Sequence, residues 1–508
     1  MTLQQLRQIS FALSRDHLLG NFIHEMASVR GAKVAATEDG SESMSYQDLA
    51  GRVDHFAAAM LALGSVRRGD RVVVATPNGV DQFLLCVAAS RIGAIAVPVN
   101  SQMRSGEIEL VVADAQPRMV VRDPSELLDG QPPEPGEITP CEAASSDIAA
   151  LFYTSGTTGT PKGVALSHRS LVGQTHLAAL WPASFRDDEV MMSLPIAHIM
   201  GFVSLVGLLT AGIAAYVVPK FTATRILDVI ESRHAGGFIG VPAMYRKLYE
   251  AGAESRDLHS IRVWMSGADV MPSDLARQFK RMGASAVVPV LGAVGEATFV
   301  EAYGMVEIGG GAATKISPAG LALPIVQDIG FKLPGYQFRA VDDHGQRVRF
   351  GRIGELQLKG PGVLQEYWNA PEATATALTE DGWLRTGDLV RLGPFGTMVF
   401  CGRLKHVIKS GGFSVYPLEV EAILDQHPDV AEACVVAIGD PVLGEVPAAA
   451  LRLHEGSSLD ETSIQLFLEE RLSRFKQPRR FVQIEEFPRT GTQKIDKARV
   501  AALFDRHG

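Results

Sequence analysis

The sequence predicts a large α/β domain followed by a small α+β domain. At 508 residues the chain is too long for one compact hydrophobic core, so two or more domains are expected. In the N-terminal part, short apolar runs alternate with stretches of helical periodicity, which is typical of a parallel sheet with helices on its faces. In the C-terminal part, helical stretches alternate with strand-like runs, which indicates a smaller mixed unit.

The N-terminal elements follow one another at short intervals. Residues 1–30 have helical character and lead to a strand near 33–36. The next helix is predicted over 46–63, where apolar residues such as Leu49 and Val53 recur at helical spacing. The elements predicted after it are a strand at 71–75, a helix at 80–91 and a strand at 94–97. Residues 124–147 are rich in Pro, Glu and Ser, which predicts a surface connection.

The later elements are predicted in the same way. The apolar stretch 199–218 is broken by glycines, which predicts a buried helix ending at Gly212 and a strand over 214–218. A helix over 273–282 precedes the Ala/Gly-rich stretch 287–300, which we expect to be a loop. The C-terminal predictions are a helix at 418–426, strands at 431–438 and 448–453, a helix at 463–472 and a strand at 480–484.

The composition is that of an ordinary soluble globular protein, with 46% hydrophobic and 21% charged residues. The net charge of -9 argues against nucleic acid as a partner. Four cysteines without CxxC spacing suggest reduced thiols in a cytoplasmic protein. No stretch reaches the roughly eighteen apolar residues of a membrane span, so we expect no integral membrane segment.

The stretch Tyr153–Gly163, with the sequence YTSGTTGTPKG, follows an apolar run that predicts a buried strand. Its glycines permit turns that aim backbone N–H groups inward, and its Ser and Thr residues add hydroxyl donors. Lys162 adds a compact positive charge. Together these groups suit a polyphosphate, although the spacing is not the Walker pattern.

The YTSGTTGTPKG loop resembles the phosphate-loop signature of the adenylate-forming enzymes, which include acyl-CoA synthetases, luciferases and the adenylation domains of peptide synthetases. The resemblance extends over nearly the whole chain. The other segments that resemble the family are 301–307 (EAYGMVE), 382–388 (GWLRTGD), 402–421 and 487–496 (FPRTGTQKID). The resemblance implies a domain of stacked mixed sheets and helices over residues 1–402 and a mobile C-terminal domain over 403–508.

The resemblance also implies a nucleotide site. Its implied residues are Thr154, Ser155, Gly156, Thr157, Thr158, Gly159, Lys162, Gly267, Ala268, Glu301, Ala302, Tyr303, Gly304, Asp388 and Arg403. Tyr303 offers a ring face for adenine stacking, and the Asp388 carboxylate can accept both ribose hydroxyls. Glu307 offers a hard oxygen ligand for a magnesium ion that bridges the phosphates.

The acyl side of the site is implied by the segment 194–201, LPIAHIMG. Its His198 is expected beside the carboxylate being activated, and Phe202 and Gly304 are expected to line an acyl pocket. Amino-acid-activating relatives carry an Asp near this place, whereas this chain has none. An aryl, fatty or polycyclic acid is therefore favoured over an amino acid.

The C-terminal domain is implied to supply the remaining groups. Lys494 would reach the carboxylate and α-phosphate during adenylation, and Lys409 would act in the second half-reaction. Lys405 falls at the hinge, next to a His406 that stands where Asp is common. The resemblance also implies a loop on the coenzyme A side that contains Gly411 and Gly412.

The expected function is an acyl-CoA ligase. ATP would convert a carboxylic acid to its acyl-adenylate with release of pyrophosphate, and coenzyme A would then attack the acyl carbon and release AMP. Magnesium and the lysines would stabilise charge that develops on the phosphates.

Three departures from the family leave alternatives open. Val306 replaces a Thr, Gln493 replaces a Gly, and the stretch 287–300 lengthens the chain before Tyr303. One alternative is an adenylation-impaired enzyme that acts mainly on acyl-adenylate and coenzyme A. A second is a non-catalytic relative that binds nucleotide or acyl-adenylate. A third keeps the enzyme but uses a carrier protein as the thiol acceptor.

Overall fold

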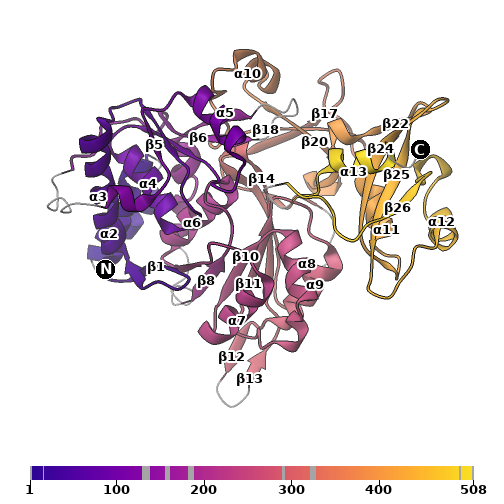
Figure 1. Cartoon of the computed structure of the whole chain (residues 1–508), viewed down its shortest axis with the longest axis horizontal. Helices are drawn as coiled ribbons and strands as arrows, with labels where there is room; N and C mark the ends of the chain where they lie inside the picture. The colour runs from indigo at the N-terminus through magenta and orange to yellow at the C-terminus, as the bar shows by residue number, and fades with distance from the viewer. Residues whose placement is uncertain are drawn as a thin grey trace. The chain divides into compact units, whose positions relative to one another are not determined.

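The structure is a computed structural model, and it describes residues 3–14, 16–128, 138–154, 161–180, 188–288, 292–320, 328–490 and 494–505 (Figure 1). The chain forms two compact units. The first comprises Met1–Gln337 and Lys359–Leu384, and the second comprises Phe338–Leu358 and Arg385–Gly508. The expected division into domains of residues 1–402 and 403–508 stays a prediction.

The first unit contains a six-stranded sheet in the order β19-β7-β6-β4-β3-β5. Its strands are β3 (Arg71–Val74), β4 (Ile95–Pro98), β5 (Met119–Val121), β6 (Ile148–Thr154), β7 (Lys162–Ser167) and β19 (Glu366–Tyr367). Strands β3 to β6 run parallel, whereas β7 and β19 are antiparallel to their neighbours. The predicted strands and their parallel arrangement are confirmed.

The same unit contains a nine-stranded sheet in the order β16-β15-β14-β11-β10-β8-β9-β1-β2. Its strands are β1 (Val34–Glu38), β2 (Ser43–Ser45), β8 (Glu189–Met192), β9 (Ala214–Val217), β10 (Gly237–Gly240), β11 (Val263–Gly267), β14 (Thr298–Met305), β15 (Gly310–Ser317) and β16 (Phe331–Lys332). The central strands from β1 to β14 are parallel, and the strands at both edges are antiparallel.

Helices cover these sheets and also lie between them. The helices of this unit are α1 (Leu3–Leu13), α2 (Leu19–Arg30), α3 (Tyr46–Gly64), α4 (Val80–Arg91), α5 (Ser105–Ala115), α6 (Ile199–Ala211), α7 (Ala223–Arg233), α8 (Pro242–Glu250), α9 (Ser273–Met282) and α10 (Pro371–Ala377). Helix α4 is buried along nearly its whole length because it contacts β3, β4 and β6 of one sheet and β1 of the other. The predicted stacking of sheets and helices is thus confirmed.

One predicted loop was wrong. The Ala/Gly-rich stretch 287–300 contributes to a hairpin in which β12 (Ala286–Val288) pairs antiparallel with β13 (Gly292–Val294), and Thr298 already begins β14. The prediction weighed the small residues and overlooked the valines, which favour extended pairing. Residues 289–291 lie outside the described part of the chain.

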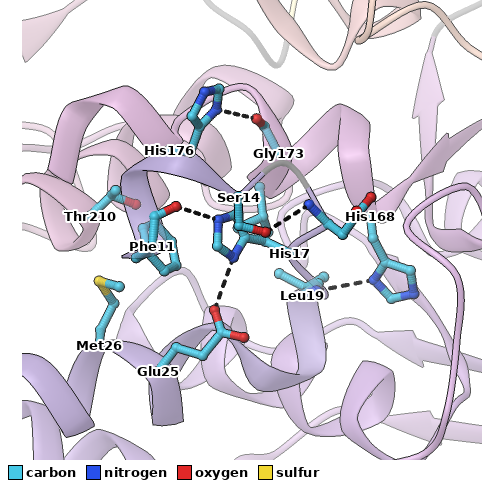
Figure 2. Close-up of polar contacts among 12 residues, drawn as sticks. Phe11, Ser14, His17, Leu19, Glu25, Met26, His168, Gly173, His176 and Thr210 are labelled. Atoms are coloured by element: carbon cyan, nitrogen blue, oxygen red, sulfur yellow. Dashed lines mark hydrogen bonds and ion pairs between the residues drawn. The ribbon is translucent and has the colours of Figure 1, made fainter. Parts of the chain in front are cut away.

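Two buried histidines fix the N-terminal segment to this unit (Figure 2). The His17 ring lies between Phe11 and Glu25, with its Nε2 2.9 Å from the Phe11 carbonyl oxygen and its Nδ1 3.1 Å from the Glu25 carboxylate. His168 Nδ1 accepts a hydrogen bond of 3.0 Å from the Leu19 backbone N–H, at the start of α2. The helical prediction over residues 1–30 is therefore confirmed as two helices with an anchored connection.

The second unit contains two sheets. A four-stranded sheet has the order β17-β18-β20-β21, and a second sheet has the order β23-β22-β25-β24 with β26 added to β25. The strands are β17 (Gln337–Val341), β18 (Ile353–Lys359), β20 (Leu384–Leu392), β21 (Met398–Arg403), β22 (Ile408–Ser410), β23 (Phe413–Val415), β24 (Val430–Asp440), β25 (Gly444–Leu453) and β26 (Phe481–Gln483). The helices are α11 (Pro417–Leu424), α12 (Glu461–Glu469) and α13 (Lys497–Asp505).

Alternation along β24 gives this second sheet two buried faces. Val435 packs in a cluster with α11 and α12, whereas Cys434 and Val436 pack with Val500 and Phe504 of α13. Successive strand residues point to opposite faces, so one continuous apolar run serves both layers. The predicted small α+β unit is confirmed. Among the described residues, no helix is long and apolar enough to cross a membrane.

Candidate active site

The strands on either side of the expected phosphate loop form a hairpin. Thr154 ends β6 and Lys162 begins β7, and the two residues are paired across the antiparallel strands. The structure therefore brings the two ends of the loop together. Five of the expected loop residues lie outside the described residues, namely Ser155, Gly156, Thr157, Thr158 and Gly159.

The base of this hairpin is tightly packed. The Tyr153 hydroxyl donates to Asp114 Oδ2 at 2.6 Å. Burial, together with this hydrogen bond, raises the pKa of the Tyr153 phenol, so the hydroxyl remains a donor. A β-carbon built on Gly163 would lie 3.0 Å from Tyr153 Cζ and 3.2 Å from Trp368 Cβ. A larger residue at position 163 would therefore push the strands apart.

The expected metal ligand, Glu307, lies half-buried on a short 3-10 helix, η6 (Val306–Ile308). Its carboxylate Oε1 accepts a hydrogen bond of 3.0 Å from the Tyr367 hydroxyl, and its carbonyl oxygen accepts one of 2.8 Å from the Leu364 N–H. In the described ranges, no three or more His, Cys, Asp or Glu residues gather as a metal site. A single carboxylate suits magnesium, which commonly keeps water and substrate phosphate oxygens as its other ligands.

Val306 stands next to Glu307 where a Thr is common, and its side chain is only 8% exposed. A buried isopropyl group offers no hydrogen bond to a phosphate. The structure thus places this departure directly beside the expected metal ligand.

The expected adenine-binding segments are neighbouring strands. Gly267, at the end of β11, is paired with Ala302 of β14, and Tyr303 and Gly304 follow on β14. A β-carbon on Gly304 would lie 1.8 Å from the Gly310 carbonyl oxygen, so only glycine fits there. Ala268 has a φ of 67°, a left-handed conformation that disfavours residues with a β-carbon.

Glu301 forms an ion pair with Lys315, a residue that the sequence did not indicate as its partner. Its carboxylate lies 3.2 Å from Lys315 Nζ, and the two residues are directly paired between β14 and β15. Burial raises the pKa of the Glu301 carboxyl, and the Lys315 charge opposes that shift. Only the strand register could have revealed this ion pair, because fourteen positions separate the two residues along the chain.

His198 caps the N-terminus of α6, with its Nδ1 accepting from the Met200 N–H at 3.3 Å. Gly201 packs its α-carbon against the Pro195 backbone, because a β-carbon there would lie 2.2 Å from the Pro195 oxygen. Phe202 is fully buried, with its ring 4.9 Å from that of Phe83. Phe202 thus supports α6 from the core, and its place in an acyl pocket stays a prediction.

The half-buried side of α6 lies against strands β11 and β15. A β-carbon on Gly267 would lie 3.3 Å from Met200 Cε, and one on Gly310 would lie 2.8 Å from Val203 Cγ2. Gly207 continues this side of the helix, and a β-carbon there would meet no heavy atom of the described residues within 4 Å outside its own stretch of helix. No charged residue occurs in α6.

Asp388 and Arg403 belong to the second unit and are directly paired between β20 and β21. Arg403 Nε lies 2.6 Å from Asp388 Oδ1, and the Asp388 side chain is 2% exposed whereas that of Arg403 is 41% exposed. The structure therefore joins the two expected ribose-side residues in one ion pair.

The expected hinge lies on a short 3-10 helix, η8 (Leu404–His406). Burial and the nearby Arg403 charge lower the pKa of the Lys405 ammonium. Burial, reinforced by Lys497, Lys405 and Arg403, lowers the pKa of His406 to about 4. A neutral imidazole thus stands among cations where relatives commonly carry a carboxylate.

The expected loop on the coenzyme A side is a two-residue turn. Ser410 of β22 pairs with Phe413 of β23, and the intervening Gly411 and Gly412 have φ values of 54° and 85°. Two consecutive positive φ angles fit the hairpin turn that favours glycine. Lys409 precedes the turn, with its Nζ donating to Ser414 Oγ at 2.9 Å.

Lys494 is half-buried in the C-terminal segment, and its carbonyl oxygen accepts from the Thr490 N–H at 2.8 Å. The neighbouring residues Arg489 and Ile495 form an antiparallel bridge. Gln493, which precedes Lys494 and stands where the family has Gly, lies outside the described residues.

The model of the AMP-binding enzyme family matches residues 23–368, and that of the AMP-binding enzyme C-terminal domain matches residues 419–494. The chain belongs to the AMP-binding enzyme family.

Curated relatives support this assignment. The chain is 31% identical over 494 residues to an indoleacetate–CoA ligase of Aromatoleum aromaticum, with 91% of this chain and 94% of that protein covered. It is 30% identical over 496 residues to a feruloyl-CoA synthase of Amycolatopsis sp, with 92% and 96% covered.

Solved structures show the same fold. ATP-bound MatB from Rhodopseudomonas palustris matches with a TM-score of 0.84 and 26% identity, over 96% of this chain and 99% of that chain. The o-succinylbenzoate CoA synthetase MenE from Bacillus subtilis, in complex with its acyl-adenylate, matches with a TM-score of 0.81 and 25% identity, over 96% and 98%. The chain is therefore an AMP-forming acid–thiol ligase that uses ATP, a carboxylic acid and coenzyme A, and works through an acyl-adenylate.

Proposed function

We propose that the acid carries, beyond its carboxylate, an uncharged and largely apolar acyl group that lies along the half-buried side of α6. The observation that carries this proposal is the uncharged sequence of α6, together with the closeness of Met200 to Gly267 of β11 and of Val203 to Gly310 of β15. An acyl group there would meet methyl and methylene groups and would need no counter-charge. The relatives include ligases named for indoleacetate, ferulate and medium-chain fatty acids, which supports an aryl or fatty acid here.

We propose the following roles for the polar groups. Lys162, Lys494 and the loop hydroxyls would bind the phosphates, Glu307 would hold magnesium, and Asp388 with Arg403 would bind the ribose. His198 would lie beside the substrate carboxylate. It caps the N-terminus of α6, next to Met200, and Met200 lies close to Gly267 of the expected adenine site. In the second step Lys409 would assist attack by the thiol. Magnesium would offset the negative charge that develops as pyrophosphate leaves.

A panel of acids tests the substrate class. Aryl, straight-chain fatty, polycyclic and amino acids would each be offered with ATP, magnesium and coenzyme A, and the thioesters identified by mass. We expect aryl or fatty thioesters, and no amino-acyl product. A preference for an amino acid or for a dicarboxylic acid would contradict the proposal.

A second candidate is favoured by the buried Val306. An enzyme without the Thr hydroxyl would adenylate slowly while still converting acyl-adenylate and coenzyme A to thioester. Pyrophosphate release with ATP, measured beside thioester formation from a synthetic acyl-adenylate, separates the two candidates. Fast pyrophosphate release would exclude the second one. If adenylation is slow, Val306→Thr should accelerate it about tenfold, as expected for one hydrogen bond to a charged group.

The thiol acceptor and the cellular setting are also proposals. We propose free coenzyme A as the acceptor, supported by the relatives named as CoA ligases. Comparing coenzyme A with a phosphopantetheinylated carrier protein in the second step tests this. We propose a cytoplasmic setting, supported by the free thiols of Cys86, Cys141, Cys401 and Cys434.

A further inference from the structure

The segment 364–368 forms backbone hydrogen bonds with both sides of the expected phosphate site. On one side it pairs with β7, where the Trp368 N–H donates to the Gly163 carbonyl at 2.7 Å. On the other side, the Leu364 N–H donates to the Glu307 carbonyl at 2.8 Å. This segment therefore links the strand that begins with Lys162 to the helix that carries Glu307.

Tyr367 is the residue of this segment that contacts both functional side chains. Its hydroxyl donates to Glu307 Oε1 at 3.0 Å, which leaves the second carboxylate oxygen for another ligand. Lys162 Nζ lies 5.7 Å from the centroid of its ring, within the range of a cation–π contact. All three side chains are half-buried, so solvent screens these contacts only in part.

We propose that Tyr367 is a positioning residue that sets the Glu307 carboxylate and the Lys162 ammonium at a fixed separation for the nucleotide phosphates. The hydroxyl fixes the orientation of the carboxylate, and the ring fixes the position of the ammonium. The two contacts use different parts of one side chain, so substitution can remove one without the other. This inference rests on the proposed metal role of Glu307 and phosphate role of Lys162.

Two variants separate the contacts. Tyr367→Phe removes the hydroxyl and keeps the ring over Lys162. Tyr367→Leu removes both. The matched control is Tyr336→Phe, because the Tyr336 hydroxyl is also close to η6 but donates to Gln174 Oε1 at 2.8 Å and to the Ile308 carbonyl oxygen at 3.2 Å, and not to the Glu307 carboxylate. Glu307→Gln provides the reference for loss of the metal ligand.

Binding is measured without turnover. The probe is α,β-methylene-ATP, titrated calorimetrically into each full-length protein at a series of magnesium concentrations, including none. Manganese binding to each nucleotide complex, followed by electron paramagnetic resonance, reports the metal directly. Melting temperatures confirm that each variant is folded.

Magnesium should tighten the binding of α,β-methylene-ATP. We expect Tyr367→Phe to raise the magnesium concentration that gives half of this effect about fivefold or more, and to leave nucleotide binding without metal unchanged. Tyr367→Leu should show the same shift and also bind about threefold more weakly without metal. Tyr336→Phe should match the unsubstituted protein. A magnesium response of Tyr367→Phe that equals the unsubstituted one, while Glu307→Gln has lost its response, would overturn the role of Tyr367. A magnesium response retained by Glu307→Gln would instead overturn the metal role of Glu307, and the Tyr367 proposal with it.

Discussion

At the scale of single residues, Ala268 carries local backbone strain beside the expected adenine site. Its φ of 67° is one that glycine adopts freely and alanine does not. We expect Ala268→Gly to raise the free energy of unfolding by about 0.5–1 kcal/mol, since relief of strain exceeds the entropy that glycine adds to the unfolded chain. Urea unfolding followed by fluorescence measures this.

The control for this prediction is Ala302→Gly on the adjacent strand β14, which is paired with Gly267. Ala302 has no positive φ, so glycine there should lower stability by about 0.5–1 kcal/mol. If both variants are equally destabilised, Ala268 is not strained.

His168 makes stability depend on pH. Burial lowers its pKa from 6.5 to about 4, and its side chain is 5% exposed. Because the folded pKa lies below the unfolded value, the unfolded chain takes up the proton first as the pH falls below about 6.5. His168 should therefore lower the free energy of unfolding progressively as the pH falls from about 6.5 to about 4, by up to about 3 kcal/mol.

His168→Asn tests this. An asparagine oxygen can accept from the Leu19 N–H as His168 Nδ1 does, and it does not titrate. We expect the difference in urea midpoint between pH 7 and pH 5 to shrink in this variant. The His17 pKa is raised, so His17 adds stability that is present at low pH and is lost as pH rises. An unchanged pH difference in His168→Asn would assign the dependence to other groups.

At the scale of elements, α6 offers a test of the acyl position. Gly207 is one helical turn beyond Val203 on the half-buried side, and no other described residue fills the space at the position of its β-carbon. We expect Gly207→Phe to lower kcat/KM for long acids at least tenfold while short acids are still used, because the ring would occupy the path of the acyl chain. Rates across a series of chain lengths measure this effect.

The matched control is Gly207→Ala. It adds only a methyl group to open space, so activity should be kept, and the helix should gain about 0.5–1 kcal/mol from the better helix former. Loss of long and short acids alike in Gly207→Phe would place the acyl group elsewhere.

The elements also show where sequence patterns succeed. The helix over 273–282 was predicted to the residue, because its apolar period is strong and Pro and Gly flank it. The hairpin of β12 and β13 was missed, because short strands rich in Ala and Gly look like loops. The Glu301–Lys315 ion pair was missed for a different reason, because the spacing of residues along the chain does not reveal the register of paired strands.

At the scale of the whole molecule, each compact unit has its own core. Of the four tryptophans in the chain, the three that the structure describes, Trp264, Trp368 and Trp383, lie in the first unit, so their fluorescence reports on that unit. Leu424 is fully buried in the core of the second unit. We expect Leu424→Ala to lower the stability of the second unit by about 2–5 kcal/mol.

The measurement compares two probes of urea unfolding. Far-ultraviolet circular dichroism should show an earlier transition in Leu424→Ala, whereas the fluorescence transition should stay in place. Equal shifts in both probes would mean that the two units unfold together.

The molecule as a whole was predictable from sequence to a considerable depth. The fold class, the superfamily and the ligase class followed from the family resemblance that motifs such as 153–163 and 382–388 carry. The roles of individual site residues were not settled by sequence, because they depend on atoms brought together over long separations. Tyr367 illustrates this: it lies 60 positions from Glu307, and no local pattern links the two.

The two-residue strand β19 has a consequence for how this protein folds during its synthesis. It forms the outer edge of the sheet that carries the phosphate loop, yet it comes from residues 366–367. On the ribosome, β7 is made some two hundred residues before its edge partner emerges, at about 5–20 residues per second. For that interval the nascent chain presents an open strand edge, the feature through which incomplete proteins aggregate. Translation speed and chaperone capture over this stretch should thus influence the yield of active enzyme.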